Sequence, residues 1–392
     1  MNKLKNEALL LHEKAKGKLA TAIKVPCSTM EDLTLAYSPG VAYPCLEIKE
    51  NKEDVYRYTN KGNTVAVITD GSAVLGLGNI GPEAALPVME GKALLFKRFA
   101  DVDAVPICLN TQDVNQIVTI CEMLAPTFGG INLEDISAPR CVEIERELIQ
   151  RLDIPVFHDD QHGTAIVVLA GLINSLKLTK RTADKCKVVV SGTGAAGSSI
   201  IKQLYNYGFR EIIAFDKDGV LVSSQSESYD FLKRELLSYV NPNDVAYPSL
   251  ADALVDADVF IGVSVANIVD EQMVKSMKKE PIIFAMANPD PEISYEKAKR
   301  AGALIVGTGR SDVPNQVNNI LAFPGLFRGL LDAKATKINE EVKLAVSIAL
   351  AELIAPEELT EEYIIPNVLD ERVVPTVAKA VEKICNEKGN TR

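Results

Sequence analysis

Apolar and polar positions along the chain predict two successive blocks of alternating strands and helices. In the first block, β-branched and apolar runs predict strands at 64–69, 103–109, 130–133 and 154–157. Apolar residues at helical spacing predict the intervening helices at 82–99, 114–124, 142–152 and 164–176, the last apolar enough to be buried. Strands that alternate with helices in this way are typical of parallel βαβ units.

A polar run at 179–185 separates this block from a second one of the same kind. Its predicted strands lie at 187–190, 211–215, 258–263, 282–287 and 303–306. From Asn339, a predicted N-cap, the chain is helical again as far as Pro356. The 392 residues therefore predict an α/β protein of two domains with a cleft between them, whose C-terminal helices pack back on the first domain.

A glycine-rich motif opens the second block. The apolar strand Val188 to Val190 leads into Gly192-Thr193-Gly194-Ala195-Ala196-Gly197, and a predicted helix at 198–207 follows. In dinucleotide-binding folds such glycines allow a tight turn, close approach of the pyrophosphate and close helix–strand packing. A purely structural glycine turn is the alternative. The flanking strand and helix favour a Rossmann-type, doubly wound NAD(P)-binding domain, with phosphate at the helix N-terminus.

The next predicted strand ends at Asp216. A carboxylate at this place accepts hydrogen bonds from the adenosine ribose and repels a 2′-phosphate, so we expect NAD as cofactor. Lys217 lies beside it and weakens that preference, which leaves NADP as the alternative.

Acidic residues follow two neighbouring strands of the first block. Glu134 and Asp135 come after one strand, and Asp159 and Asp160 after the next. Because the carboxyl ends of parallel strands meet at one edge of a sheet, we expect these acids to converge. An all-oxygen set suits Mg²⁺ or Mn²⁺, whereas each acid alone could be an N-cap or a surface charge. His158 and His162 flank the second pair, but no third His or Cys lies near enough to favour zinc.

The composition of the chain limits the kinds of molecule that the protein is expected to bind and the setting in which it is expected to work. The net charge of −11 disfavours nucleic acid and anionic membranes, which bind basic surfaces. The seven cysteines form no CxxC pair, so we expect no disulfide framework and a reducing, cytoplasmic setting. The N-terminal apolar run, Ala8 to Leu11, is too short for a signal peptide, and we expect no segment to approach the roughly 20 apolar residues of a membrane span.

Seven segments resemble the signatures of the malic enzyme family, in the family's order. They are Tyr37-Ser38-Pro39-Gly40-Val41-Ala42, Thr69 to Gly81, Glu90-Gly91-Lys92-Ala93, Asn132-Leu133-Glu134-Asp135, His158 to Thr164, Ala287-Asn288-Pro289, and Asn318-Asn319 with Phe323-Pro324-Gly325. The chain's length is similar to that of the short bacterial form. The resemblance implies domains at 1–162 (N-terminal catalytic), 163–318 (NAD(P)-binding) and 319–392 (C-terminal helices on the first domain).

The resemblance also implies a role for each matching residue. Tyr37 would be the general acid and Lys92 the general base, and Lys92 would also contact substrate. The metal ligands would be Glu134, Asp135 and Asp160, with Asp159 beside them. Asn288 and Asn319 would bind the malate carboxylates, and Asn288 would also lie at the cofactor. Without the family match, Lys92 would be interpreted as a surface charge and Tyr37 as a packed aromatic residue.

One departure from the larger forms concerns substrate binding. Their arginine in the loop after the Asp-Gly pair, which pairs with a substrate carboxylate, is replaced here by Ser72-Ala73-Val74. The sequence does not indicate which cation replaces it.

The implied reaction is oxidative decarboxylation of (S)-malate to pyruvate and CO₂ with reduction of NAD(P). Lys92 must lose its proton to act as base, so we expect burial among apolar neighbours or a nearby cation to lower its pKa. A malolactic-type lyase that releases lactate without net NAD turnover is one alternative, which the short chain disfavours, and a non-catalytic NAD sensor is another. We expect a homodimer or larger homo-oligomer with the N-terminal region at the interface, where Tyr37 could serve a neighbouring subunit.

Overall fold

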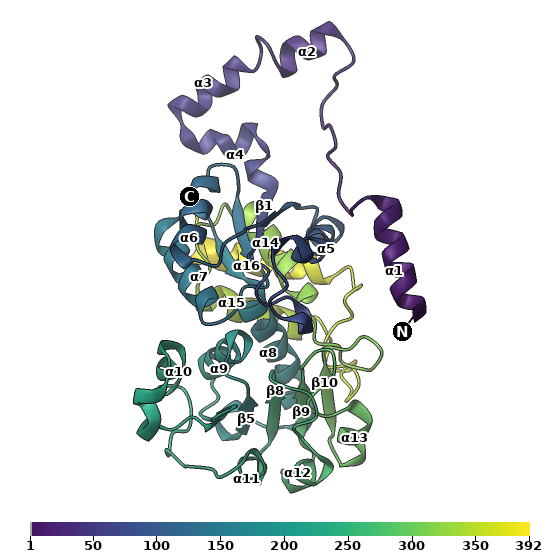
Figure 1. Cartoon of the computed structure of the whole chain (residues 1–392), viewed down its shortest axis with the longest axis vertical. Coiled ribbons are helices and arrows are strands. Elements are labelled where there is room, and N and C mark those ends of the chain that lie inside the picture. Colours follow the sequence, from purple (N-terminus) through teal and green to yellow (C-terminus); the bar gives the residue numbers. More distant parts are fainter. Residues whose placement is uncertain (1) are drawn as a thin grey trace.

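The computed structural model describes residues 2–392, and its N-terminal part is an extended arm whose residues 30–50 stand away from the rest (Figure 1). The arm contains α1 (Asn2–Ala15), α2 (Met30–Ala36), α3 (Ala42–Glu50) and α4 (Val55–Tyr58). Short 3₁₀ turns at Lys52–Asp54 and Asn60–Asn63 connect it to the body. Between residues 3 and 60 no side chain is buried, so the arm has no core of its own in one chain.

The first sheet is parallel and has the strand order β2-β1-β3-β4. Its strands are β1 (Thr64–Thr69), β2 (Asp103–Cys108), β3 (Gly130–Leu133) and β4 (Val156–His158). The helices of this block are α5 (Pro82–Ala100), α6 (Val114–Leu124) and α7 (Arg140–Arg151). Every residue of β1 and β3 is buried, as expected for parallel strands covered on both faces. The strands predicted for the first block are confirmed.

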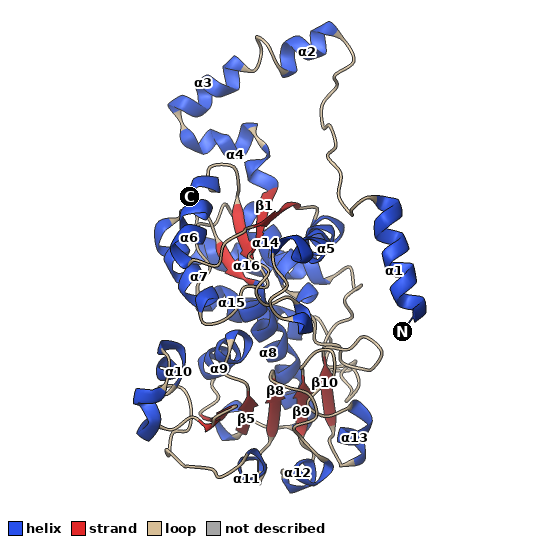
Figure 2. Ribbon diagram, viewed as in Figure 1, coloured by secondary structure: helices blue, strands red, loops and turns tan. Residues whose placement is uncertain are grey.

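The second sheet has the strand order β10-β9-β8-β5-β6-β7 and is parallel except at β7 (Figure 2). Its strands are β5 (Lys187–Ser191), β6 (Glu211–Asp216), β7 (Gly219–Val220), β8 (Val259–Gly262), β9 (Ile282–Ala285) and β10 (Ile305–Thr308). The helices are α9 (Ala195–Tyr207), α10 (Phe231–Leu236), α11 (Leu250–Leu254), α12 (Glu271–Ser276) and α13 (Tyr295–Arg300). The strand order reverses direction at β5, as in doubly wound nucleotide-binding folds, which confirms the predicted fold class.

A long central helix, α8 (Asp159–Thr179), connects the two sheets. Among residues 2–392 it is the one helix long and apolar enough to cross a membrane, which corrects the expectation that no segment would approach that length. However, 72% of its apolar window is buried inside the protein, where the helix packs against α9 and α15 (Glu340–Glu352). Its apolar character therefore follows from its place in the core.

The C-terminal helices return to the first sheet. A 3₁₀ turn at Asn319–Leu321 leads into α14 (Phe323–Asp332), which packs against both α5 and α16 (Val373–Lys388). The Phe96 ring lies 4.8 Å from that of Phe323 and 5.3 Å from that of Phe327, centroid to centroid. Each buried ring contributes about 1.5–3 kcal/mol. The predicted N-cap Asn339 accepts a hydrogen bond from the Val342 amide at 3.0 Å. The domain limits at residues 162 and 318 remain a prediction.

Candidate active site

Three carboxylates converge where β3 and β4 end. Leu133 pairs with His158 in the sheet, so the residues that follow each strand start at the same level. One ligand atom each from Glu134, Asp135 and Asp160 lies within 4.8 Å of the other two. Glu134 and Asp135 are each only 5% exposed. The structure thus brings together the three residues that the sequence predicts as metal ligands.

The chemistry of this cluster fits a hard divalent cation. Burial, followed by repulsion from Asp160, raises the pKa of Asp135 to about 7. Burial likewise raises the pKa of Glu134 well above its ordinary value, against the attraction of Lys92. The buried Oδ2 of Asp135 and Oδ1 of Asp159 have no hydrogen-bond partner. A cation with oxygen ligands, such as Mg²⁺ or Mn²⁺, would satisfy such atoms and offset the repulsion.

Lys92 on α5 is bound directly to this cluster. Its Nζ lies 2.6 Å from Asp159 Oδ2 and 2.8 Å from Glu134 Oε1, and 4.1 Å from the centroid of the Phe323 ring. Burial by itself lowers the pKa of Lys92, but the Asp159 and Glu134 carboxylates outweigh it, and the net direction is upward. The protein alone therefore does not lower the pKa of Lys92, although its apolar neighbours in sequence led us to expect this.

Asp159 is the hub of the site, a position that the sequence analysis gave only as adjacent to the ligands. It is fully buried, and its Oδ2 accepts hydrogen bonds from Lys92 and, at 3.0 Å, from the Asn319 amide nitrogen. The Oδ1 of Asn319 accepts a hydrogen bond from the Thr164 hydroxyl at 3.0 Å. Asn132, which the sequence analysis placed in a family segment without a role, also contacts the cluster: its amide donates to Glu134 Oε2 at 2.8 Å. Its buried polar side chain within an otherwise apolar strand was the available signal.

The two sheets meet at this site through their loops. Asn288 follows β9, and a Cβ added at Gly76, in the loop after β1, would lie 3.0 Å from the Asn288 carbonyl oxygen. Gly309, after β10, also packs on the Asn288 side chain, where an added Cβ would lie 3.4 Å from Oδ1. Asn288 therefore lies where loops of both blocks converge.

The glycine motif forms the predicted strand–turn–helix. Gly192 has φ +107°, and a Cβ at Gly197 would lie 1.8 Å from the Gly192 carbonyl oxygen, so both positions require glycine. Next to Gly194 there is open space, because an added Cβ would meet no atom within 4 Å. Thr193, Ala195 and Ala196 complete the turn into α9, whose N-terminus has no side-chain cap. Free amides beside open space suit a bound phosphate.

Family comparisons agree with these features over nearly the whole chain. The family described as "Malic enzyme, N-terminal domain" matches residues 16–149, and "Malic enzyme, NAD binding domain" matches residues 161–386. The chain belongs to the malic enzyme family.

Its relatives include short bacterial malic enzymes. The chain is 58% identical over 389 residues to the bifunctional malic/malolactic enzyme of Bacillus subtilis, covering 99% of this chain and 95% of that one. It is 51% identical to the NAD-dependent malic enzyme of Geobacillus stearothermophilus, covering 96% and 78%. The crystal structure of an NAD-dependent malic enzyme from Thermotoga maritima superposes with a TM-score of 0.92 at 48% identity, covering 96% and 98%.

An acidic residue, Asp216, ends the second strand of the nucleotide-binding sheet, β6, and it is not free. The Asp216 carboxylate forms an ion pair with Lys233 of α10 and accepts a hydrogen bond from the Asp218 amide at 2.7 Å. The lysine that pairs with Asp216 is thus Lys233, whereas the sequence analysis considered Lys217. Lys233 lies on a separate helix, so its proximity could not be inferred from sequence.

Tyr37 is the one predicted catalytic residue of this malic enzyme family member that one chain does not bring to the site. It ends α2 in the N-terminal arm, and 73% of it is exposed. Figure 1 shows α2 and α3 well separated from both sheets, whereas Lys92 lies on α5 in the body. Within a single chain, Tyr37 and Lys92 are therefore apart.

Proposed function

We propose that this protein oxidises (S)-malate with NAD(P) and decarboxylates the product to pyruvate and CO₂. Lys92 takes the C2 hydroxyl proton while hydride leaves C2 for the nicotinamide. The C3–C4 bond of the resulting oxaloacetate then breaks, CO₂ departs, and Tyr37 protonates C3 of enolpyruvate. The observation that carries the proposal is the contact of Lys92 with two carboxylates, at a cluster of acidic residues whose chemistry suits a divalent cation. Membership of the malic enzyme family supports it.

Glu134, Asp135 and Asp160 are the residues that would hold the metal. Bound Mg²⁺ or Mn²⁺ would supply a Lewis acid for the C2 oxygen, and its positive charge would oppose the attraction that raises the pKa of Lys92. Asp159 and Phe323 fix the position of Lys92, and Asn319 holds Asp159 from the other side. Asn288 and Asn319 would orient the malate carboxylates.

Tyr37 would act on a neighbouring copy of the chain. The arm exposes a series of large apolar side chains: Met30, Leu33, Leu35, Tyr37, Val41, Tyr43 and Leu46. An apolar surface of this kind on an extended arm is typical of an interface between subunits. A homo-oligomer in which the arms pack on each other would bury it and bring Tyr37 to the second site.

A mixing experiment tests the arrangement. Tyr37→Phe and Lys92→Ala variants, each inactive alone, are refolded together. If Tyr37 acts in trans, the mixed dimer contains one intact site, and statistical mixing restores about a quarter of wild-type activity. If Tyr37 acts in its own chain, no intact site forms and activity stays at the background of either variant.

The reaction itself is tested by reduced-nicotinamide absorbance with malate, Mn²⁺ and either NAD or NADP, with and without chelator, and by assay of pyruvate. Metal-dependent reduction with equimolar pyruvate is the expected result. Folded protein that reduces neither cofactor would rule out the oxidative reaction.

A malolactic reaction is the second candidate function. The Bacillus subtilis relative is named as a bifunctional malic/malolactic enzyme and matches this chain along 95% of its length. The short chain is therefore no argument against lactate formation. Lactate produced without net change in nicotinamide absorbance would identify this activity.

A further inference from the structure

Malate binding requires a cation for a carboxylate, and the arginine of the larger malic enzymes is absent from the loop at 72–74. Two cations near that loop are already fully engaged. Lys92 bridges Glu134 and Asp159. Arg140 donates to Asp70 Oδ2 at 2.9 Å and also to the hydroxyls of Ser72 and Ser137 and to the Gln112 carbonyl. Displacing either would leave a buried carboxylate without its partner, which is strongly unfavourable.

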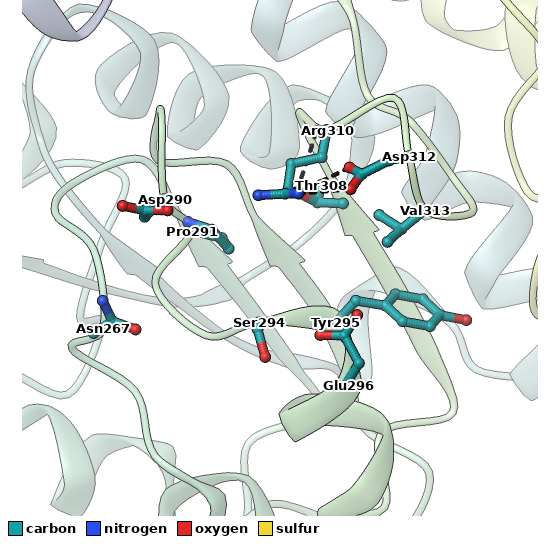
Figure 3. A pocket seen from close by; sticks show the side chains of 10 residues that line it. All are labelled: Asn267, Asp290, Pro291, Ser294, Tyr295, Glu296, Thr308, Arg310, Asp312 and Val313. Atoms are coloured by element: carbon teal, nitrogen blue, oxygen red, sulfur yellow. Dashed lines mark hydrogen bonds and ion pairs between the residues drawn. The ribbon is translucent and has the colours of Figure 1, made fainter. Parts of the chain in front are cut away.

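Arg310 differs from Lys92 and Arg140 in its location and in its ion-pair partner. It follows β10, and Figure 3 shows its side chain above the carboxyl ends of the strands, bordering a cavity of about 200 Å³ that Asp290 and Thr308 also line. The carboxyl edge of a doubly wound sheet is where ligands bind. The preceding residue, Gly309, packs on the Asn288 side chain, so Arg310 lies next to a predicted substrate ligand.

The loop that carries Arg310 continues to the centre of the site. The Gln316 side chain donates to the Gly309 carbonyl at 3.4 Å, and the same segment ends at Asn319, which contacts Asp159. One loop thus joins Arg310 at one end to the carboxylate hub at the other.

The present partner of Arg310 is a carboxylate that can be exchanged. Its Nε lies 2.8 Å from Asp312 Oδ1 and its Nη2 lies 2.6 Å from Oδ2, a two-point contact between residues only two positions apart. Both side chains are substantially exposed, at 44% and 60%. Exposed ion pairs contribute little to stability, so a ligand carboxylate can replace Asp312 at small cost. The guanidinium is already arranged for a planar carboxylate.

We propose that Arg310 binds the C1 carboxylate of malate, taking the role that the loop arginine has in the larger enzymes. This inference rests on the proposed function. The C1 carboxylate remains in pyruvate, whereas the C4 carboxylate loses its negative charge as CO₂. A cation on C4 would oppose that loss, so Arg310 is assigned to C1.

The test compares Arg310→Gln with Arg372→Gln. Arg372 forms the same kind of two-point pair with Asp370, two residues away, and is 54% exposed, so it is a matched control. We expect Arg310→Gln to raise the KM for malate about 100-fold and leave the KM for the nicotinamide cofactor unchanged. Arg310→Lys should recover part of the loss, and Arg372→Gln should behave as wild type.

Inhibition by oxalate identifies the carboxylate. Oxalate resembles the C1 carboxylate and C2 oxygen of enolpyruvate and has no counterpart of C4, so its inhibition constant should rise in Arg310→Gln by the same factor as the KM for malate. Asp312→Asn, which removes the competing carboxylate, should lower the KM for malate. An unchanged KM in Arg310→Gln, or an equal effect of Arg372→Gln, overturns the inference. A raised KM with unchanged oxalate inhibition overturns the C1 assignment.

The experiments distinguish a failure of the proposed function from a failure of the inference about Arg310. If the wild-type protein forms pyruvate or lactate from malate while Arg310→Gln retains its KM, only the role of Arg310 is refuted. If the wild-type protein forms neither product, the proposed function fails, and the inference about Arg310 fails with it.

Discussion

Gly163 leaves the space that the side chain of Asp159 occupies, one helical turn earlier in α8. A Cβ at Gly163 would lie 2.0 Å from Asp159 Oδ1, far inside any van der Waals contact, and 3.3 Å from Asn319 Cγ. Asp159 in turn holds Lys92 and Asn319. The absence of one side chain therefore permits the arrangement of three others.

Gly163→Ala should consequently displace Asp159 and misplace Lys92. Misplacement of a reacting group by about 1 Å can cost about 100-fold in rate, and we expect a loss of that order in kcat/KM for malate. Gly91→Ala is the matched control, because Gly91 adjoins Lys92 in α5 and an added Cβ there would meet no atom within 4 Å. Wild-type kinetics for Gly163→Ala would show that Asp159 does not position the base.

Metal binding should be visible without any turnover. Glu134 and Asp135 are buried carboxylates with raised pKa values, and a cation that binds them stabilises only the folded state. At 100 times its Kd, Mn²⁺ should add about 2.7 kcal/mol to the free energy of unfolding, measured as a higher Tm in thermal denaturation. Excess chelator should reverse the shift.

Asp160→Asn should abolish most of this stabilisation, because it removes one of the three converging carboxylates. Asp184→Asn, at an exposed position far along the chain, should retain the full shift. Equal Mn²⁺ shifts in the two variants would contradict the assignment of the metal to this cluster.

Some of these contacts could be predicted from the sequence, and others could not. Glu134, Asp135 and Asp160 were predicted to meet because the geometry of one βαβ unit fixes where adjacent parallel strands end. The glycine turn was predicted for a similar local reason. The two-residue strand β7 was missed because it is too short to show an apolar period.

Contacts between distant segments depend on tertiary packing, which the pattern of apolar and polar residues along the sequence does not specify. Lys92 and Asp159 are 67 positions apart, and Asn319 and Asp159 are 160 apart. Apolar neighbours in sequence suggested a lowered pKa for Lys92, whereas its carboxylate partners, brought in by tertiary structure, raise it. For the same reason Lys233, on another helix, was not foreseen as the partner of Asp216.

The Asp216–Lys233 pair should set the preference between NAD and NADP. Lys233 offsets the charge of Asp216, which would otherwise repel a 2′-phosphate, so Lys233→Ala should lower kcat/KM for NADP about 10-fold relative to NAD. Asp216→Ser should shift the ratio towards NADP. Initial rates with each cofactor at saturating malate measure both effects.

The Lys217→Ala variant distinguishes the effect of Lys217 on cofactor preference from that of Lys233. Since Lys233 forms the ion pair with Asp216, we expect Lys217→Ala to leave the NAD-to-NADP ratio within about twofold of wild type. A larger change for Lys217 than for Lys233 would assign cofactor choice to the adjacent residue.

Assembly through the N-terminal arm should depend on its exposed apolar side chains. Leu35 on α2 is 71% exposed in the single chain, and a charge at this position would be buried without a partner in an oligomer. Leu35→Glu should therefore dissociate the assembly, as measured by light scattering or sedimentation, and should abolish activity at low protein concentration if Tyr37 works in trans. Leu369→Glu is the matched control, because Leu369 is 70% exposed but lies outside the arm. An active monomeric Leu35→Glu variant would refute action in trans, and equal dissociation by Leu369→Glu would refute the arm as the interface.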